Sequence, residues 1–182
     1  MPKATLPSGS LTPLADCFIE IPILDETIEM NILPDISDSK SASYPDESAI
    51  GRSMPFKSYQ NSDNRTISWT AHFMVCKDGD QETIINYLRV IEACTYPLSE
   101  ETGGAPYAPP PICKLRCGDL LSSMDSDDLC AVMKSYSVKF DTSVPWDEDG
   151  YLPYKLDVDM QFEVVYNQAD LPGAEKIMEG GV

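Results

Sequence analysis

The chain has 182 residues, 42% of them hydrophobic, so it can bury a core as one domain with a long excursion. Thirteen Lys and Arg residues against thirty Asp and Glu residues leave a formal net charge of −17. Because affinity for nucleic acid comes mainly from cationic side chains, this charge excludes tight binding to a phosphate backbone or an anionic membrane. No secretory signal is visible at the N-terminus, and the apolar runs are shorter than the about 20 residues of a membrane span. We therefore expect folding in a cytoplasm, where the six cysteines are reduced.

The N-terminal part is predicted to be an arm followed by two strands. Residues 1–16 are rich in Pro and Ser and show no strand periodicity. Residues 18–24 and 27–33 alternate apolar and polar side chains around an Asp-Glu pair, which predicts a hairpin or a bend. Pro22 cannot donate a ladder hydrogen bond, so we expect the first run at a sheet edge or a bulge.

Residues 34–65 have no clear period and are rich in Ser, Asp and Pro. Unstructured loops longer than about 12–15 residues are uncommon inside compact domains. We therefore expect this segment to be an arm that orders against a neighbouring subunit.

The middle of the chain predicts one strand and one helix. Residues 66–76 alternate over their whole length, with Ile67, Trp69, Ala71, Phe73 and Val75 on the buried side. A helix is predicted over about 80–94 from the spacing of Ile84, Leu88 and Ile91, with Asp78 or Asp80 as its cap and Pro97 beyond its end.

The C-terminal third has the clearest pattern. Three consecutive prolines, ending in Pro110 and Pro111, predict a stiff extended segment before a short strand at 112–117. Alternation then predicts two long strands, 131–142 and 154–166. The first would point Tyr136, Val138 and Phe140 inward; the second would bury Leu156, Val158, Met160, Phe162 and Val164. A hairpin excursion at 143–153 connects them, and a polar tail, 167–182, follows.

Together these elements predict a mainly β protein with one helix. We expect residues 17–166 to form a single antiparallel barrel or two-sheet sandwich, with the helix capping one opening. Strands 18–24 and 112–117 are expected at its edges, where they would pair with a neighbouring subunit.

Catalytic chemistry finds little support in the residue pattern. The single histidine, His72, lies four residues from Cys76, which places the two side chains about 13 Å apart along a strand. A solvated or interface histidine is the better interpretation, and we expect no enzyme activity. The acidic clusters at 125–128 and 147–150 lack the alternating carboxylates of a calcium loop, so we expect no cofactor.

The cysteines leave three interpretations open. Cys113 and Cys117 are four residues apart in a predicted strand, and Cys130 follows, but no second Cys pair completes a zinc pattern. Buried thiols, a metal site and disulfides, including disulfides between subunits, all remain compatible with this spacing.

Four segments carry a resemblance to a known family: PPICKLRCG (110–118), AVMKSYSVKF (131–140), WDEDG (146–150) with Leu152 and Pro153 after it, and LDVDMQFEVV (156–165). Their order and spacing resemble the tail-tube family of contractile phages and related injection machines. Residues 51–55, Ser68, Trp69 and the predicted helix resemble the same proteins more loosely, so the likeness covers about residues 18–166.

The resemblance implies a β-barrel or sandwich subunit with a flanking helix, assembled as a six-fold ring around a DNA channel. Its partners would be copies of itself and neighbouring tail-tube and baseplate hub proteins. The long segment at 34–65 and the tail favour a baseplate ring that initiates or caps the tube. We thus expect a virion tail component assembled in the host cytoplasm, past which DNA slides without specific binding.

Two sets of site residues follow. Asp157, Asp159 and Glu163 lie on one side of strand 154–166, and we expect them to line the channel, because a wide aqueous space would relieve their mutual repulsion. Replacing all three with Lys should keep the fold and impede genome ejection. A solvated outer face is the other interpretation of these acids.

The second set is expected at subunit interfaces: Trp146, Tyr151, Pro110 and Pro111. Trp146 is flanked by Pro145 and three acids, which is unusual for a free loop tip, so we expect another chain to bury it. The alternative function is a host-surface or carbohydrate-binding β-sandwich of a tail fibre or adhesin, with Trp146, Tyr151 and Tyr154 as its aromatic cluster.

Overall fold

The structure is a computed structural model that describes residues 16–48, 50–51, 53–76, 79–98, 108–118, 120–121, 129–147 and 152–166. The predicted N-terminal arm, except its last residue, and the predicted tail at 167–182 lie outside the described residues, as does Tyr151.

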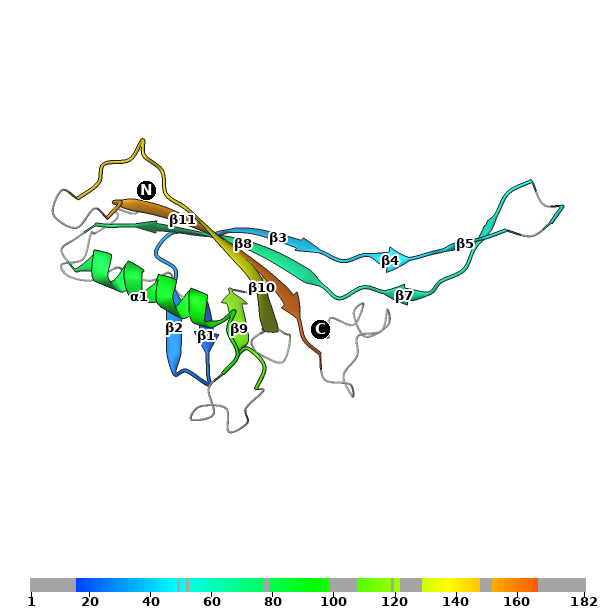
Figure 1. The fold of residues 1–182 in the computed structure, drawn as a ribbon, viewed down its shortest axis with the longest axis horizontal. Helices are drawn as coiled ribbons and strands as arrows, with labels where there is room; N and C mark the ends of the chain where they lie inside the picture. Colours follow the sequence, from blue (N-terminus) through cyan, green and yellow to red (C-terminus); the bar gives the residue numbers. More distant parts are fainter. Residues whose placement is uncertain are drawn as a thin grey trace.

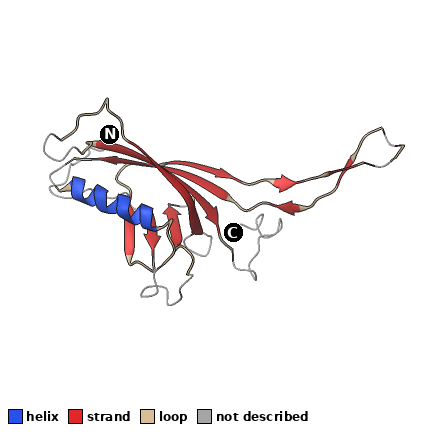
Figure 2. Cartoon of the chain, in the orientation of Figure 1, coloured by secondary structure: helices blue, strands red, loops and turns tan. Residues whose placement is uncertain are grey.

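The regular secondary structure of the described residues consists of antiparallel strands and one helix (Figure 2). In chain order they are β1 (Cys17–Ile21), β2 (Glu26–Glu29), β3 (Asp35–Ser39), β4 (Ala42–Ser43), β5 (Asp46–Glu47), β6 (Phe56–Lys57), β7 (Asn61–Ser62), β8 (Thr66–Met74), α1 (Asp80–Ala93), β9 (Ile112–Cys117), β10 (Leu129–Lys139) and β11 (Lys155–Val164). The predicted mainly β class with one helix is therefore confirmed, and the helix bounds differ from the prediction by one residue.

Seven strands form one sheet in the order β2-β1-β9-β10-β11-β8-β3. The sheet changes direction along β10: residues 129–132 pair with β9 and residues 131–139 pair with β11, with a register shift between Met133 and Ser135. Figure 1 shows the result: β1, β2 and β9 run across β8 and β11 rather than along them. The bent sheet thus supplies both layers of an open sandwich.

The core lies between the two halves of this sheet. On β8 and β11 the predicted inward residues are buried, and the register places Trp69 opposite Met160 and Ile67 opposite Phe162. The other half contributes Ile19, Ile21, Ile28, Cys113 and Leu115. Fully burying a large apolar side chain contributes about 1.5–3 kcal/mol, so this shared core holds the two halves together.

Helix α1 covers one opening of the sandwich. Its Ile84 and Ile91 are buried, and the ring of Tyr87 lies 5.8 Å from that of Phe73 on β8. The predicted side-chain cap is wrong for Asp80, because the N-cap is Gly79, whose φ of 94° favours glycine. The Asp80 carboxylate instead accepts a hydrogen bond from the Cys76 amide at 3.0 Å, which ties the helix start to the end of β8. Asp78 lies outside the described residues.

The sequence prediction was wrong about the sheet edges. β1 lies between β2 and β9, and β9 lies between β1 and β10, so both are interior strands. Pro22 is compatible with this position because β1 ends at Ile21 and the proline begins the turn. Among the described strands, β2 and β3 are the edges, and the sheet does not close into a barrel.

The segment at 34–65, which we expected to be an arm that orders against a neighbouring subunit, contains β3 and a β-hairpin extension. β3 pairs with the first half of β8, and beyond them β4 pairs with β7 and β5 with β6. We call residues 40–65 the arm. It projects from the body to the far right of Figure 1.

Candidate functional site: interaction surfaces

The outer face of the sheet carries the predicted channel-lining carboxylates. Asp157, Asp159 and Glu163 alternate with the buried residues of β11, so they point away from the core, as the sequence predicts. We call these three residues the acidic face. A single subunit has no lumen for this face to line, so its position in a channel stays a prediction.

Each carboxylate of the acidic face has a partner on a neighbouring residue. Asp157 Oδ1 lies 2.7 Å from His72 Nδ1, and the Thr70 hydroxyl donates to Asp159 at 2.7 Å. Glu163 lies 2.7 Å from Lys134 Nζ and also accepts a hydrogen bond from Asn64. The repulsion that we expected along β11 is therefore offset within the subunit by Lys134, Lys155 and neighbouring hydrogen-bond donors, so it does not by itself require an open aqueous space.

His72 joins the acidic face to the edge strand β3. Its second ring nitrogen, Nε2, lies 3.3 Å from Asp35 at the start of β3. The hydrogen bond with Asp157 is the main cause that raises the pKa of His72, against the opposing effect of burial. Burial would raise the pKa of Asp157, but hydrogen bonds from His72 and Lys155 hold that pKa below its ordinary value. Both shifts favour the charged form of their group, and the two hydrogen bonds give the lone histidine a structural role.

Residues 140–147, which follow β10, hold Trp146 partly within its own chain, and Trp146 forms a β-bridge with Pro153. The indole Nε1 donates to the carbonyl oxygen of Asp141 at 3.1 Å, and the ring lies 6.4 Å from that of Phe140. Trp146 is half-buried, so part of its ring is open to a partner, and burial by another chain stays a prediction. Phe140, predicted inward, is largely exposed.

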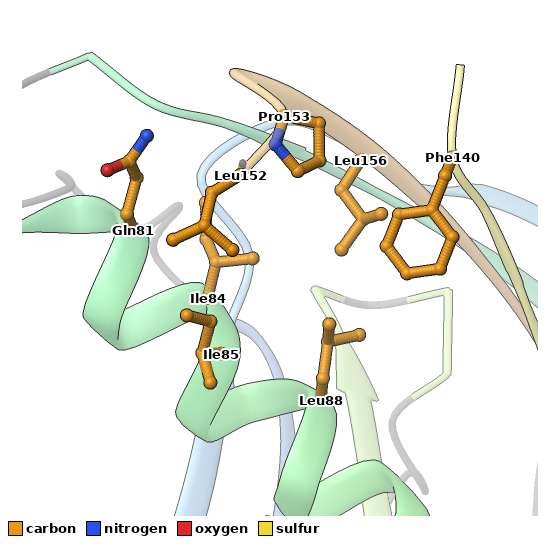
Figure 3. Close-up of a pocket in the computed structure, with 8 residues that line it drawn as sticks. All are labelled: Gln81, Ile84, Ile85, Leu88, Phe140, Leu152, Pro153 and Leu156. Atoms are coloured by element: carbon orange, nitrogen blue, oxygen red, sulfur yellow. The ribbon is translucent and has the colours of Figure 1, made fainter. Parts of the chain in front are cut away.

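An apolar hollow separates this part of the chain from helix α1 (Figure 3). Figure 3 shows Leu152 and Pro153 facing Ile84 and Leu88 of the helix, with Phe140 at the other side. Its volume of about 40 Å³ holds a few water molecules at most, so it is a packing seam between two elements.

A larger apolar groove runs beside the proline segment. It has a volume of about 410 Å³ and is lined by Pro22, Ile23, Leu98, Ala108, Pro109, Pro110, Pro111, Ile112, Lys114 and Cys130. The predicted interface residues Pro110 and Pro111 thus line a concave surface, although Pro111 itself is buried. The groove brings the proline segment beside the β1–β2 turn, which the sequence did not indicate.

The arm is the surface that sequence reasoning described least well. It exposes Met54 by 77% and Tyr59 by 60%, together with Tyr44, Ile50 and Phe56. The rings of Tyr44 and Tyr59 meet edge to face at 5.7 Å. Cross-strand polar contacts, such as the 2.9 Å ion pair of Lys57 with Asp46, hold the two strands of the hairpin together.

The buried cysteines meet in pairs. Cys17 Sγ lies 3.6 Å from Cys117 Sγ, and the thiols of Cys94 and Cys113 share a hydrogen bond, whereas Cys76 is exposed. Among the described residues there is no group of three or more His, Cys, Asp or Glu side chains placed to hold a metal ion.

No protein-family model matches the chain, and no curated protein matches its sequence. In the part of the chain that the structure describes, no helix is long and apolar enough to cross a membrane.

Proposed function

We propose that this protein is a structural subunit of a phage-type contractile tail baseplate, forming a ring that initiates or caps the tail tube. The observation that carries the proposal is the arm, a two-stranded extension that exposes large apolar side chains away from the core. The resemblance of segments 110–118, 131–140, 146–150 and 156–165 to tail-tube proteins sets the class of assembly.

The arm needs a partner for physical reasons. An isolated two-stranded hairpin is marginally stable in water, because it has no third strand or helix to cover its apolar side chains. Met54, Phe56 and Tyr59 are exposed on such a hairpin. Contact with a neighbouring subunit would remove this surface from water and order the arm.

The sheet edges suggest how neighbours join. β2 and β3 lie at opposite ends of the seven-stranded sheet, and neither has a second neighbouring strand among the described residues. Pairing β2 of one subunit with β3 of the next is a head-to-tail contact. Head-to-tail contacts generate a closed ring when the rotation between subunits closes. Such a ring would also continue the sheet into one larger barrel.

The acidic face could line a DNA channel, but it would repel passing DNA less strongly than its sequence suggests. Three carboxylates are accompanied by Lys134, by Lys155 and by His72, whose pKa is raised by its hydrogen bond with Asp157. The local charge is therefore nearly balanced, and it attracts a phosphate backbone little. DNA would pass without adhesion because no net positive surface holds it, rather than because a strong field repels it.

Electron microscopy of the purified full chain tests the proposal. We expect closed rings, with six copies as the family implies, at micromolar concentrations. A variant that joins Ser41 to Asp63 through an Asn-Gly turn removes most of the arm at a point where the Asp63 amide already donates to the Ser41 carbonyl, at 2.9 Å. It should fold as a monomer and form no rings.

The matched control replaces Leu33, an exposed residue outside the arm, with Ser and should leave the rings intact. Wild-type protein that stays monomeric alone and with its parent particle's tail proteins would contradict the proposal.

The edge-to-face pair of Tyr44 and Tyr59 supports a second candidate, a carbohydrate- or host-surface-binding module. Exposed aromatic rings are the surfaces on which sugar rings stack. Saturation-transfer NMR with a glycan panel would detect such binding, and Tyr44→Ser should abolish it. Absence of saturation transfer to every glycan of the panel would contradict this second candidate.

A further inference from the structure

Four buried cysteines from three elements meet along the short strand β9. Cys113 and Cys117 both point into the core from β9. Cys17 of β1 contacts Cys117, and Cys94, which follows α1, contacts Cys113. The sequence separation of Cys17 and Cys117 is 100 residues, so their meeting depends on the whole fold between them.

The backbone places Cys17 and Cys117 directly opposite each other in the sheet. The Gly118 amide donates to the Asp16 carbonyl at 2.7 Å, and the Met30 amide donates to the Cys17 carbonyl at 3.1 Å. The backbone hydrogen bond of the Cys17 carbonyl is thus directed to the β2 side. The hydrogen bond toward β9 is made by Asp16 and Gly118, the residues next to the cysteine pair. This is the non-hydrogen-bonded type of antiparallel pair, in which the Cα atoms lie about 4.5 Å apart. That separation is within the range that a disulfide spans.

We propose that Cys17 and Cys117 are a modification site, at which thiol–disulfide exchange with a small-molecule disulfide forms an intrachain disulfide. One cysteine thiolate attacks the small disulfide and releases one small thiolate, which leaves a mixed disulfide. The second cysteine thiolate then attacks the protein sulfur of that bond, forms the Cys17–Cys117 bond and releases the second small thiolate. The two cysteines lose two protons and two electrons, and the electrons reduce the small disulfide to two thiols.

Burial determines when this reaction occurs. It raises the pKa of Cys17 to about 12, with the contact to Cys117 as the second cause. Because the thiolate is the attacking species, exchange in the folded, reduced protein is slow at neutral pH. The bond therefore forms efficiently during folding in an oxidising mixture, and once formed it is shielded from reductants.

The disulfide would fasten β1, the first described strand, to β9, its neighbour on the side away from the edge strand β2. The closed loop contains the arm, β8 and α1. In the chain-entropy account, closing a loop of this length restricts the unfolded chain strongly, which corresponds to a rise of roughly 10 °C in the melting temperature. This inference does not rest on the proposed function, because it concerns the body of one subunit.

Refolding of the full chain tests the proposal. Denatured protein is refolded with a mixture of oxidised and reduced glutathione, alkylated, digested and mapped by mass spectrometry without reduction. We expect a crosslinked peptide pair containing Cys17 and Cys117, and a melting temperature about 10 °C above that of the reduced protein. Cys17→Ser and Cys117→Ser should each remove both the crosslink and the shift.

Two matched controls separate this pair from the other thiols. Cys76→Ser, at an exposed cysteine, and the double variant C94S/C113S, at the other buried pair, should keep the crosslink and the shift. A crosslink of Cys17 or Cys117 to any other cysteine, a disulfide between two chains, or wild-type protein that refolds fully reduced would overturn the proposal. Peptide mapping of the wild-type protein distinguishes these outcomes even if a serine variant fails to fold.

Discussion

The body and the arm of this protein are both antiparallel β-structure, but they differ in what stabilises them. Along β8 and β11, every second residue is buried in a common core. In the arm, β5, β6 and β7 are exposed on both sides. β8 and β11 also pair with strands on both sides, whereas each arm strand pairs with one strand only. The body is therefore stabilised by side-chain burial and by a wider sheet, and the described arm residues have neither.

The largest expected effect comes from the body. Trp69 is fully buried between Ile67 and Ala71 on β8 and faces Met160 on β11. We expect Trp69→Ala to lower the free energy of unfolding by about 3–5 kcal/mol, through lost burial and a cavity. Urea denaturation at a protein concentration below that of ring assembly measures this change. A loss below about 1 kcal/mol would mean that burial of this side chain does not stabilise the body.

The arm should show the opposite behaviour. Replacing both Met54 and Tyr59 with Ser should change the unfolding free energy of the monomer by less than about 0.5 kcal/mol. It should weaken assembly by about 2 kcal/mol or more, because buried apolar anchors dominate interface energetics. Sedimentation velocity reports the assembly, and urea denaturation reports the fold. Unchanged assembly would remove the arm from the interface.

Trp146 lies between a side chain that stabilises only the subunit and one that stabilises only the assembly. Its indole contacts Asp141 and Phe140 within its own chain, but the ring is only half-buried. We expect Trp146→Ala to weaken assembly by more than the about 1 kcal/mol that it removes from monomer stability. Equal losses would assign the side chain to the subunit's own fold. Phe140→Ala, which removes only the ring contact, serves as the comparison.

The acidic face should contribute little to folding. Substituting all three of its carboxylates with amides (D157N, D159N and E163Q) keeps the side-chain shapes and some of the hydrogen bonds. We expect a loss of about 1 kcal/mol, since such exposed pairs contribute modestly. Replacement of all three with Lys, which the sequence alone predicts to keep the fold, should instead destabilise it, because it would place cations beside Lys134 and Lys155. Rings assembled from the amide variant should retain more DNA than wild-type rings, and the amount retained should depend on the salt concentration.

The smallest effect concerns pH. The pKa of His72 in the folded protein is raised above 6.5, so its stabilising contribution is complete below pH 6.5 and is lost as pH rises through the folded-state pKa. The pKa of Asp157 is lowered, so its contribution is complete above pH 3.8 and is lost as pH falls through its folded-state pKa. We expect His72→Gln to remove the alkaline decline, which is below about 1 kcal/mol. Urea midpoints at pH 6 and pH 9 would measure it, and an unchanged decline in the variant would assign it to other groups.

Periodicity in the sequence determined the parts of the protein that burial controls. Alternation in residues 66–76 and 154–166 predicted the strands β8 and β11 and their buried faces, and the spacing of Ile84, Leu88 and Ile91 predicted α1. These patterns reflect the contact of each element with the core, so a short stretch of sequence contains them. The outward direction of the acidic face followed from the same alternation.

Only the tertiary structure decided which elements are neighbours. The strand order moved residues 112–117 from a predicted edge to the interior, and it gave Asp157 and Glu163 their partners on β8 and β10. The arm shows no period because both of its faces are exposed, so its strands leave no burial pattern to read. The meeting of Cys17 and Cys117 across 100 residues of chain also could not be predicted from periodicity. Periodicity specifies which face of a strand is buried, whereas long-range packing determines which residues that face contacts.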